Sequence, residues 1–361
     1  MTAALDGIKK DQLGMLADYR KKLYRKPWLR YLFLELTLRC NEYCMHCGSG
    51  CGDVRSEELP LSEYQRILDE VKADFPIRDI QLCITGGEPL MRSDFFDIMA
   101  YAHRLGFQWG MTSNAVLIDR EAARKLRETG MKTISVSIDG LRETHDRFRG
   151  LKGAYDGAMR GLENLIEEGG FAHIQVTTVL HHTNMDELEP LYDILRDMDI
   201  DSWRVIGVEP IGRALQNPEL LLTDEDQIRL FDFIREKRME HMPVTYGCSH
   251  FLGLDYEKEV REHYFICNAG VYLASIMCNG DIGACLDIER RPELIQGNIK
   301  KDRLKDVWEN RFQIFREGLD TKSGRCRDCE VREYCAGGSA HSWDYDRNEQ
   351  RICFKDLLRM N

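Results

Sequence analysis

Three cysteines with the spacing of metal ligands lie near the start of the chain. Cys40, Cys44 and Cys47 form a CxxxCxxC run directly after the apolar residues 31–38. A closed cubane iron–sulfur cluster takes four cysteine ligands, so three cysteines in one loop leave one iron open to a small molecule. A zinc ion with four thiolates is the alternative, with Cys51 as the fourth ligand. The loop is therefore a candidate metal site at which chemistry can occur.

A second set of cysteines lies past residue 260. Its members are Cys267, Cys285, Cys326, Cys329, Cys335 and Cys353. Because four thiolates also suit a structural zinc ion, zinc is an alternative for the last four of them. Asn279-Gly280, between the first two, predicts a type I′ turn that joins two strands of a hairpin.

Composition and charge restrict the class of protein. The 361 residues, 43% hydrophobic and 31% charged, are typical of a soluble globular protein with two domains or with one large barrel and an appendage. The net charge of −11 argues against a nucleic-acid partner, although basic residues gather at the N-terminus. We find no membrane span and no signal peptide, and expect a cytoplasmic protein that does not bind membranes. In that reducing compartment the 13 cysteines are expected to be metal ligands rather than disulfides.

Strand-like runs alternate with amphipathic helices from residue 32 onward. The strands are expected near 32–38, 79–84, 107–112, 132–138, 173–179 and 203–208. The helices are expected near 62–74, 94–105, 119–129, 155–168, 186–198 and 223–238. Six strand–helix units predict an α/β fold with a parallel sheet, which right-handed crossovers would curl into a partial, TIM-like (β/α)6 barrel. We expect a helical lead-in over 1–29, this barrel over 30–240, and a small cysteine-rich domain with a β-hairpin over 241–361.

Polar residues follow the predicted strands at the edge where sites of parallel sheets gather. The CxxxCxxC loop follows the first strand, and Gly86-Gly87-Glu88-Pro89 follows the second. Two glycines let the backbone approach a ligand closely, and a carboxylate can bind an ammonium group, although an ordinary tight turn would look the same. The third and fourth strands end in Ser113, Asn114, Ser137 and Asp139.

These motifs together resemble the radical S-adenosylmethionine (radical SAM) enzymes, and residues 145–150 resemble the HDxxRG segment of that family. The resemblance implies a [4Fe-4S] cluster on Cys40, Cys44 and Cys47 that cleaves S-adenosylmethionine to a 5′-deoxyadenosyl radical. It also implies a set of residues that contact the cofactor or substrate: Gly86, Gly87, Glu88, Pro89, Ser113, Asn114, Ser137 and Asp139. Arg149 is a candidate catalytic residue that would hold a carboxylate, or else pair with Asp146 at the surface. His181 and His182, and the segment 209–213, would complete the rim.

The C-terminal cysteines resemble those of the SPASM domain, which carries auxiliary iron–sulfur clusters. The resemblance implies that one auxiliary [4Fe-4S] cluster is held by Cys326, Cys329, Cys335 and Cys353. It assigns Cys267 and Cys285 to another auxiliary cluster, but Ser339 occupies the position of a further cysteine ligand. Cys278, His341 or Ser339 would have to complete that site, and Cys278 equally suits a hairpin. We therefore expect at least one auxiliary cluster.

The resemblance leaves several functions open. Peptides form the largest substrate class of SPASM proteins, so we expect oxidative modification, a crosslink or similar, of a ribosomally made peptide. The alternatives are oxidation of a protein side chain or small metabolite, of the sulfatase-maturase, sugar or haem-pathway type, and a non-enzymatic metal-stabilised binding protein. In sulfatase maturases an aspartate directly follows the cysteine that matches Cys285. Here Leu286 has that place and Asp287, one residue further on, remains a candidate catalytic residue.

Two kinds of protein partner are expected besides the substrate. An electron donor such as flavodoxin or ferredoxin would reduce the first cluster. Because only the lead-in over 1–29 precedes the barrel, a leader sequence would have to bind a separate leader-binding protein, the basic N-terminal helix or the barrel mouth.

Overall fold

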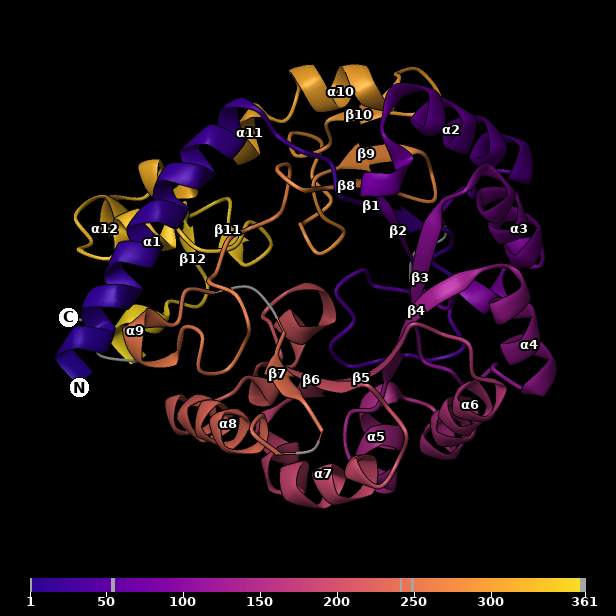
Figure 1. Cartoon of the computed structure of the whole chain (residues 1–361), viewed down its shortest axis with the longest axis horizontal. Helices are drawn as coiled ribbons and strands as arrows, with labels where there is room; N and C mark the ends of the chain where they lie inside the picture. Colours follow the sequence, from indigo (N-terminus) through magenta and orange to yellow (C-terminus); the bar gives the residue numbers. More distant parts are fainter. Residues whose placement is uncertain (1, 53–55, 241, 248–249, 358–361) are drawn as a thin grey trace.

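The computed structural model describes residues 2–52, 56–240, 242–247 and 250–357. A curved sheet forms the inner wall of a ring, and helices cover its outside (Figure 1). The predicted lead-in is the helix α1 (Thr2–Arg25), which packs on α9 (Gly253–Tyr256) and α13 (Arg332–Cys335). Two of its basic residues are buried there, since Lys9 pairs with Glu259 at 2.7 Å and Arg20 donates to backbone carbonyls of Glu333 and Tyr334. None of the described helices is long and apolar enough to cross a membrane.

The six predicted strand–helix units are confirmed, with their bounds shifted by a few residues. The strands are β1 (Tyr31–Glu35), β2 (Gln81–Thr85), β3 (Gln108–Ser113), β4 (Met131–Ser137), β5 (His173–Leu180) and β6 (Ser202–Gly207). The helices are α2 (Leu61–Asp74), α3 (Phe95–Leu105), α4 (Arg120–Glu128), α6 (Ala154–Glu168), α7 (Leu188–Arg196) and α8 (Asp224–Lys237). The six strands are parallel neighbours in sequence order. Their parallel order places every strand's carboxyl end at one edge of the sheet.

The sheet is longer than predicted at both of its sides. The short β7 (Val244–Tyr246) adds parallel to β6, and β8 (Leu273–Ile276) adds parallel to β1, with Leu34 opposite Ile276. Antiparallel β9 (Asp281–Gly283) and β10 (Gly297–Asn298) follow, so β7 and β10 are the edges of an open sheet. The pairing of β8 with β1 joins segments some 240 residues apart and leaves no local sequence pattern. The hydrogen bonds of the sheet thus continue past residue 240, the predicted end of the barrel. The division of the chain into three parts at residues 30 and 241 stays a prediction.

Burial explains why these segments form the inner layers. On β1, Leu32 and Leu34 are fully buried because both point to the same face of the strand, the face that the outer helices cover. α2 turns Tyr64, Ile67, Leu68 and Val71 toward the sheet, at the spacing of one helical face. The apolar core is continuous from β1 to the residues of the C-terminal hairpin.

The C-terminal region contains the predicted hairpin, although its turn has another type. Gly280 has φ +95° but Asn279 does not have a positive φ, as a type I′ turn would require at both central residues. Met277 accepts from Gly280 N and donates to Asp281 O, both at 2.8 Å, so the turn carries one extra residue with glycine in the left-handed position. The remaining elements are α5 (Arg142–Arg149), α10 (Leu304–Asn310), α11 (Gln313–Arg316), α12 (Gly324–Arg327), β11 (Trp343–Asp344), β12 (Glu349–Gln350) and α14 (Phe354–Leu357).

Candidate active site and metal centres

The cysteine loop (residues 39–47) leaves the carboxyl end of β1, as predicted. Two of its backbone N–H groups donate to the carbonyls of Phe148 and Arg149 at 2.9 Å, which fixes the loop on the end of α5. On the other side, the guanidinium of Arg213 donates to the carbonyl oxygens of Cys44 and Cys51 at 2.8 Å. The loop is therefore held by segments that follow β4 and β6.

The three thiols of this loop differ in their protonation. Burial raises the pKa of Cys40 to about 11 and that of Cys44 to about 12. Hydrogen bonds from the side chain and backbone of Cys51 lower the pKa of Cys47 to about 6, and the Cys51 N–H lies 3.3 Å from Cys47 Sγ. A bound metal displaces thiol protons, so a half-buried loop with three such donors fits an iron–sulfur cluster with one open iron.

The Gly86-Gly87 turn lies directly against the cysteine loop. A Cβ atom on Gly87 would be 2.1 Å from the carbonyl oxygen of Arg39 and 3.1 Å from the Cβ of Cys40. Gly86 has φ +156°, and a Cβ there would be 2.4 Å from the carbonyl oxygen of Thr37. Both positions therefore exclude side chains, because the backbone of the turn meets the backbone of residues 37–39.

Glu88 joins the ends of β2 and β3 as a fully buried carboxylate. Its Oε2 accepts from Ser113 Oγ at 2.9 Å and from Asn114 N at 3.0 Å, while Oε1 accepts from Leu90 N at 3.2 Å. Burial raises the pKa of Glu88 to about 7, although these donors oppose the shift. The Asn114 amide in turn donates to Asn41 in the cysteine loop at 2.8 Å. The structure thus brings together five of the predicted cofactor-binding positions next to the cysteine loop: Gly86, Gly87, Glu88, Ser113 and Asn114.

Arg149 belongs to a buried triad with two carboxylates. Its guanidinium contacts Asp139 at 2.6 Å and Glu42 at 3.3 Å, and its Nη1 lies 3.8 Å from Cys44 Sγ. The surface pairing with Asp146 is wrong, because Asp146 instead accepts from two backbone N–H groups at the start of α6 at 2.6 and 2.9 Å. Asp139 is thereby occupied by Arg149. Ser137, at the end of β4, is half-buried opposite Thr177.

Aromatic side chains line the loop beside this triad. His46, inside the CxxxCxxC motif, stacks on Phe148 with ring centroids 4.3 Å apart, and Phe148 contacts His181 at 4.2 Å. Burial lowers the pKa of His46 well below its usual value and that of His181 to about 4, so both rings are neutral. Neither His46 nor Glu42 was predicted as a site residue, although the position of both inside the CxxxCxxC motif was a signal. His182 instead pairs with Asp226 at 2.7 Å.

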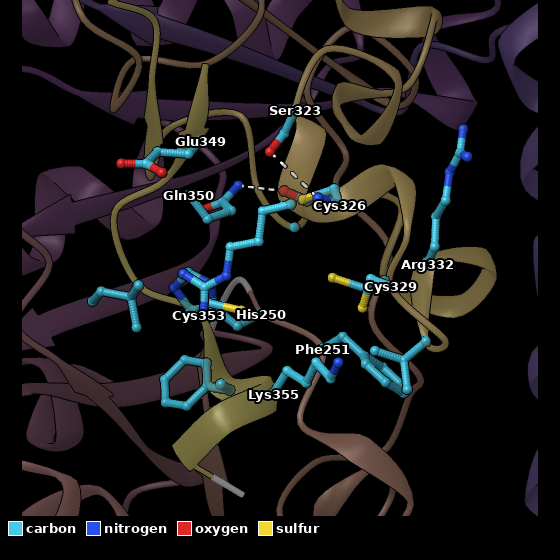
Figure 2. A pocket seen from close by; sticks show the side chains of 17 residues that line it. His250, Phe251, Ser323, Cys326, Cys329, Arg332, Glu349, Gln350, Cys353 and Lys355 are labelled. Carbon is cyan, nitrogen blue, oxygen red and sulfur yellow. Dashed lines mark hydrogen bonds between the residues drawn. The ribbon is translucent and has the colours of Figure 1, made fainter. Parts of the chain in front are cut away.

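Four C-terminal cysteines surround one pocket, as predicted. They are Cys326, Cys329, Cys335 and Cys353. Figure 2 shows three of them around the pocket with His250, Phe251 and Lys355. Burial, together with the neighbouring thiols, raises the pKa of Cys335 to about 12. Although no three described His, Cys, Asp or Glu side chains are placed to hold a single metal ion, four thiols around one pocket are the donor set of a closed iron–sulfur cluster.

The other auxiliary site is incomplete among the described residues. Cys267 and Cys285 are near each other, and Cys267 Sγ accepts from Ala340 N at 3.5 Å. Ser339 therefore occupies the expected place, and its hydroxyl is buried without a hydrogen-bond partner. His341 is buried close by, 4.0 Å from Glu209.

Cys278 does not lie with Cys267 and Cys285, which favours the alternative of a hairpin residue over that of a third ligand. It packs with Leu38 and Cys51, against Cys40 and Cys47 of the cysteine loop. The physical reason is the pairing of β8 with β1. Because the two strands are parallel neighbours, the turn after β8 and the loop after β1 leave the sheet at the same edge.

Asp287 lies between the cysteine loop and Cys285. Its Oδ1 is 3.9 Å from the position that a Cβ of Gly48 would occupy, and its Oδ2 is 3.9 Å from Cys285 Sγ. The side chain is exposed, in contrast to Arg149. The structure thus places both candidate catalytic residues near the cysteine loop, Arg149 buried beneath it and Asp287 exposed.

Known proteins share this arrangement. The model of the Radical SAM superfamily matches residues 34–195, and that of SPASM, an iron–sulfur cluster-binding domain, matches residues 267–330. The chain is 28% identical over 331 residues to the AdoMet-dependent heme synthase of Methanosarcina barkeri, across 87% of this chain and 92% of that protein. It is 31% identical over 310 residues to the mycofactocin maturase MftC of Mycolicibacterium smegmatis, across 84% and 76%. Streptococcus suis SuiB bound to S-adenosylmethionine superposes with a TM-score of 0.73 at 20% identity, over 91% of this chain and 77% of that one.

The chain therefore belongs to the radical SAM superfamily and carries a SPASM iron–sulfur domain. It is an enzyme, and its cofactors are S-adenosylmethionine, the [4Fe-4S] cluster of the radical SAM site and at least one auxiliary [4Fe-4S] cluster. Membership decides between iron–sulfur and zinc, which the cysteine spacing alone left open, and excludes the non-enzymatic alternative.

Proposed function

We propose that this enzyme oxidises a carbon–hydrogen bond of a ribosomally made peptide by two electrons, forming a crosslink or similar bond. The observation that carries the proposal is the exposed carboxylate of Asp287 beside the cysteine loop. Together with the net charge of −11, it favours a neutral or basic peptide segment over a substrate with several carboxylates. The mycofactocin maturase supports the peptide class, as does SuiB, which has been crystallised with its precursor peptide.

Most of the predicted residues at the cysteine loop have a role in this proposal. When bound, the clusters supply one-electron chemistry, namely the reductive cleavage of S-adenosylmethionine and acceptance of the substrate's second electron. Cys40, Cys44 and Cys47 hold the first cluster, and the Gly86-Gly87 turn lets the cofactor approach the backbone. Glu88 and the strand ends beside it orient the cofactor's amino group, whereas Asp287 meets the substrate.

The open sheet is compatible with a large substrate, because its strands do not close into a narrow eight-stranded barrel. β7 and β10 are unpaired edges within the described sheet, and α1 and the C-terminal elements lie between these edges (Figure 1). An electron donor such as flavodoxin or ferredoxin, and a separate leader-binding protein, are part of the same proposal.

The experiment is to co-express the enzyme with short open reading frames from its own locus and to measure peptide masses. A loss of two hydrogens, with one 5′-deoxyadenosine formed per modification, is the expected result. The peptide proposal fails if no such peptide changes mass while a metabolite stimulates formation of 5′-deoxyadenosine.

A small-molecule substrate of the haem pathway is the second candidate. The heme synthase of Methanosarcina barkeri matches this chain over 92% of its own length, more of itself than the maturase does. Incubation of the reduced enzyme with an iron porphyrin that carries propionate side chains distinguishes the two candidates, because only a porphyrin oxidase would convert it.

A further inference from the structure

The segment 209–213 contacts both cysteine-bearing regions. At one end, Arg213 N donates to the carbonyl oxygen of Cys47 at 3.1 Å, and Ile211 lies against Gly48. At the other end, the carboxylate of Glu209 accepts a hydrogen bond from His250 Nε2 at 2.8 Å. Five consecutive residues therefore connect the cysteine loop to the side chain of His250.

His250 forms part of the wall of the C-terminal cysteine pocket. It lines that pocket with the four cysteines, and its ring packs on Phe354, the neighbour of Cys353, with centroids 4.9 Å apart. Figure 2 shows His250 on the same side of the pocket as Cys353. One imidazole ring thus separates the carboxylate of Glu209 from the space that the thiols enclose.

Glu209 is a charged group in a largely dry environment. Its Oε2 is buried without a hydrogen-bond partner, and its side chain is only 16% exposed. Although burial would raise the pKa of Glu209, His250 and His341 more than offset it and hold the pKa well below its usual value. The two imidazoles thus favour the ionised form of the carboxylate, whose charge acts over several ångströms because the surroundings screen it weakly.

We propose that the buried Glu209–His250 pair sets the reduction potential of the auxiliary cluster held by Cys326, Cys329, Cys335 and Cys353. A fixed negative charge close to an iron–sulfur cluster opposes the addition of an electron, and groups around the ligands are known to tune such potentials. The imidazole of His250 limits this effect, because it stands between the carboxylate and the thiols. Neither residue is a ligand; both act through the field that they impose on the pocket.

The pair also links the segment 209–213, which contacts the cysteine loop, to the C-terminal pocket. A displacement of the segment 209–213 at the radical SAM loop would move Glu209 relative to the pocket, because only Pro210, Ile211 and Gly212 separate Glu209 from Arg213. The inference requires an iron–sulfur cluster in the C-terminal pocket, but it does not depend on whether the substrate is a peptide or a porphyrin.

The test is a redox titration followed by electron paramagnetic resonance on the full-length chain with Cys40, Cys44 and Cys47 replaced by alanine. In that background the C-terminal cluster gives the signal. Glu209→Gln should raise the midpoint potential, changing the ratio of reduced to oxidised cluster at least threefold at the wild-type midpoint, or about 28 mV. His250→Gln should lower the potential, because the carboxylate then faces the pocket without the ring. Asp226→Asn breaks another imidazole–carboxylate contact, of 2.7 Å outside the pocket lining, and should leave the potential unchanged.

Iron content separates electrostatic from structural effects. If both Glu209→Gln and His250→Gln keep wild-type iron and show an unshifted potential, the proposal is overturned. If Glu209→Gln loses iron, Glu209→Asp decides: it retains the charge and should keep both iron and potential. Loss of iron in this conservative variant as well would make Glu209 a structural residue and would also overturn the proposal.

Discussion

Replacing Gly87 by alanine should remove the radical SAM cluster and leave the auxiliary cluster in place. The new Cβ would lie 2.1 Å from the carbonyl oxygen of Arg39, whereas ordinary van der Waals contact begins at 3.4 Å. The obstacle is backbone on both sides, since the N–H of Gly87 is bound to Thr37 O at 2.7 Å. The cysteine loop must therefore move by roughly 1 Å, a displacement that by itself can cost about 10²-fold in rate.

The expected loss is measured as iron and as turnover. Each cubane holds about four irons, so Gly87→Ala should lose about four irons per chain, and 5′-deoxyadenosine formation should fall by about 10²-fold or more. Gly14→Ala is the control, because a Cβ at Gly14 meets nothing within 4 Å. Wild-type iron and wild-type 5′-deoxyadenosine formation in Gly87→Ala would refute the close approach of the two loops.

Three further results are expected from the geometry of the site. The triple variant with alanine at Cys40, Cys44 and Cys47 should form no 5′-deoxyadenosine and should retain about four irons per chain. Adding Cys278→Ala should not lower that iron count further. A count of eight irons that Cys278→Ala reduces would contradict the placement of Cys278. Arg149→Met should destabilise the chain by about 3–5 kcal/mol in urea unfolding, because it leaves Asp139 and Glu42 buried and unpaired, and adding Asp139→Asn should recover part of the loss. Burial raises the pKa of Glu88 from 4.5 to about 7. The cluster-free wild type should therefore lose stability relative to Glu88→Gln as the pH rises from 4.5 through 7. Parallel pH profiles of the urea midpoint for the two proteins would contradict this.

The elements of the fold that follow local patterns could be predicted from the sequence. The six strand–helix units between residues 31 and 237 were predictable because each carries its own hydrophobic period, whereas α5 was not predicted. β7 was missed because three residues are too few to show a period, and the position of β8 was missed because its partner is distant in sequence. The turn at Asn279-Gly280 was assigned the wrong type, since one extra residue in the loop shifts glycine alone into the left-handed region.

The candidate site, like the fold, was predictable only where its residues form a contiguous motif. The ligand loop and the Gly-Gly-Glu-Pro turn are contiguous motifs, and the structure places them in contact as predicted. Arg149 was assigned two possible roles, and only the fold shows that its partners are Asp139 and Glu42, the latter 107 positions away. The contact of Glu209 with His250 depends on the path of a loop and carries no signal in the sequence.

The placement of Glu35 shows why the SPASM region belongs to the wall of the radical site. Glu35 ends β1 as a buried carboxylate, and its partners come from the turn of the C-terminal hairpin and the segment after it: the N–H of Cys278, at 3.3 Å, and the guanidinium of Arg290. A buried carboxylate without such partners would be costly, so the strand that carries the cysteine loop depends on residues some 250 positions later. The carboxylate thus ties the first strand to the segment that follows β8, beside the cysteine loop. The region that carries the C-terminal cysteines therefore contributes to the support of the radical SAM site, although the two look like separate modules in the sequence.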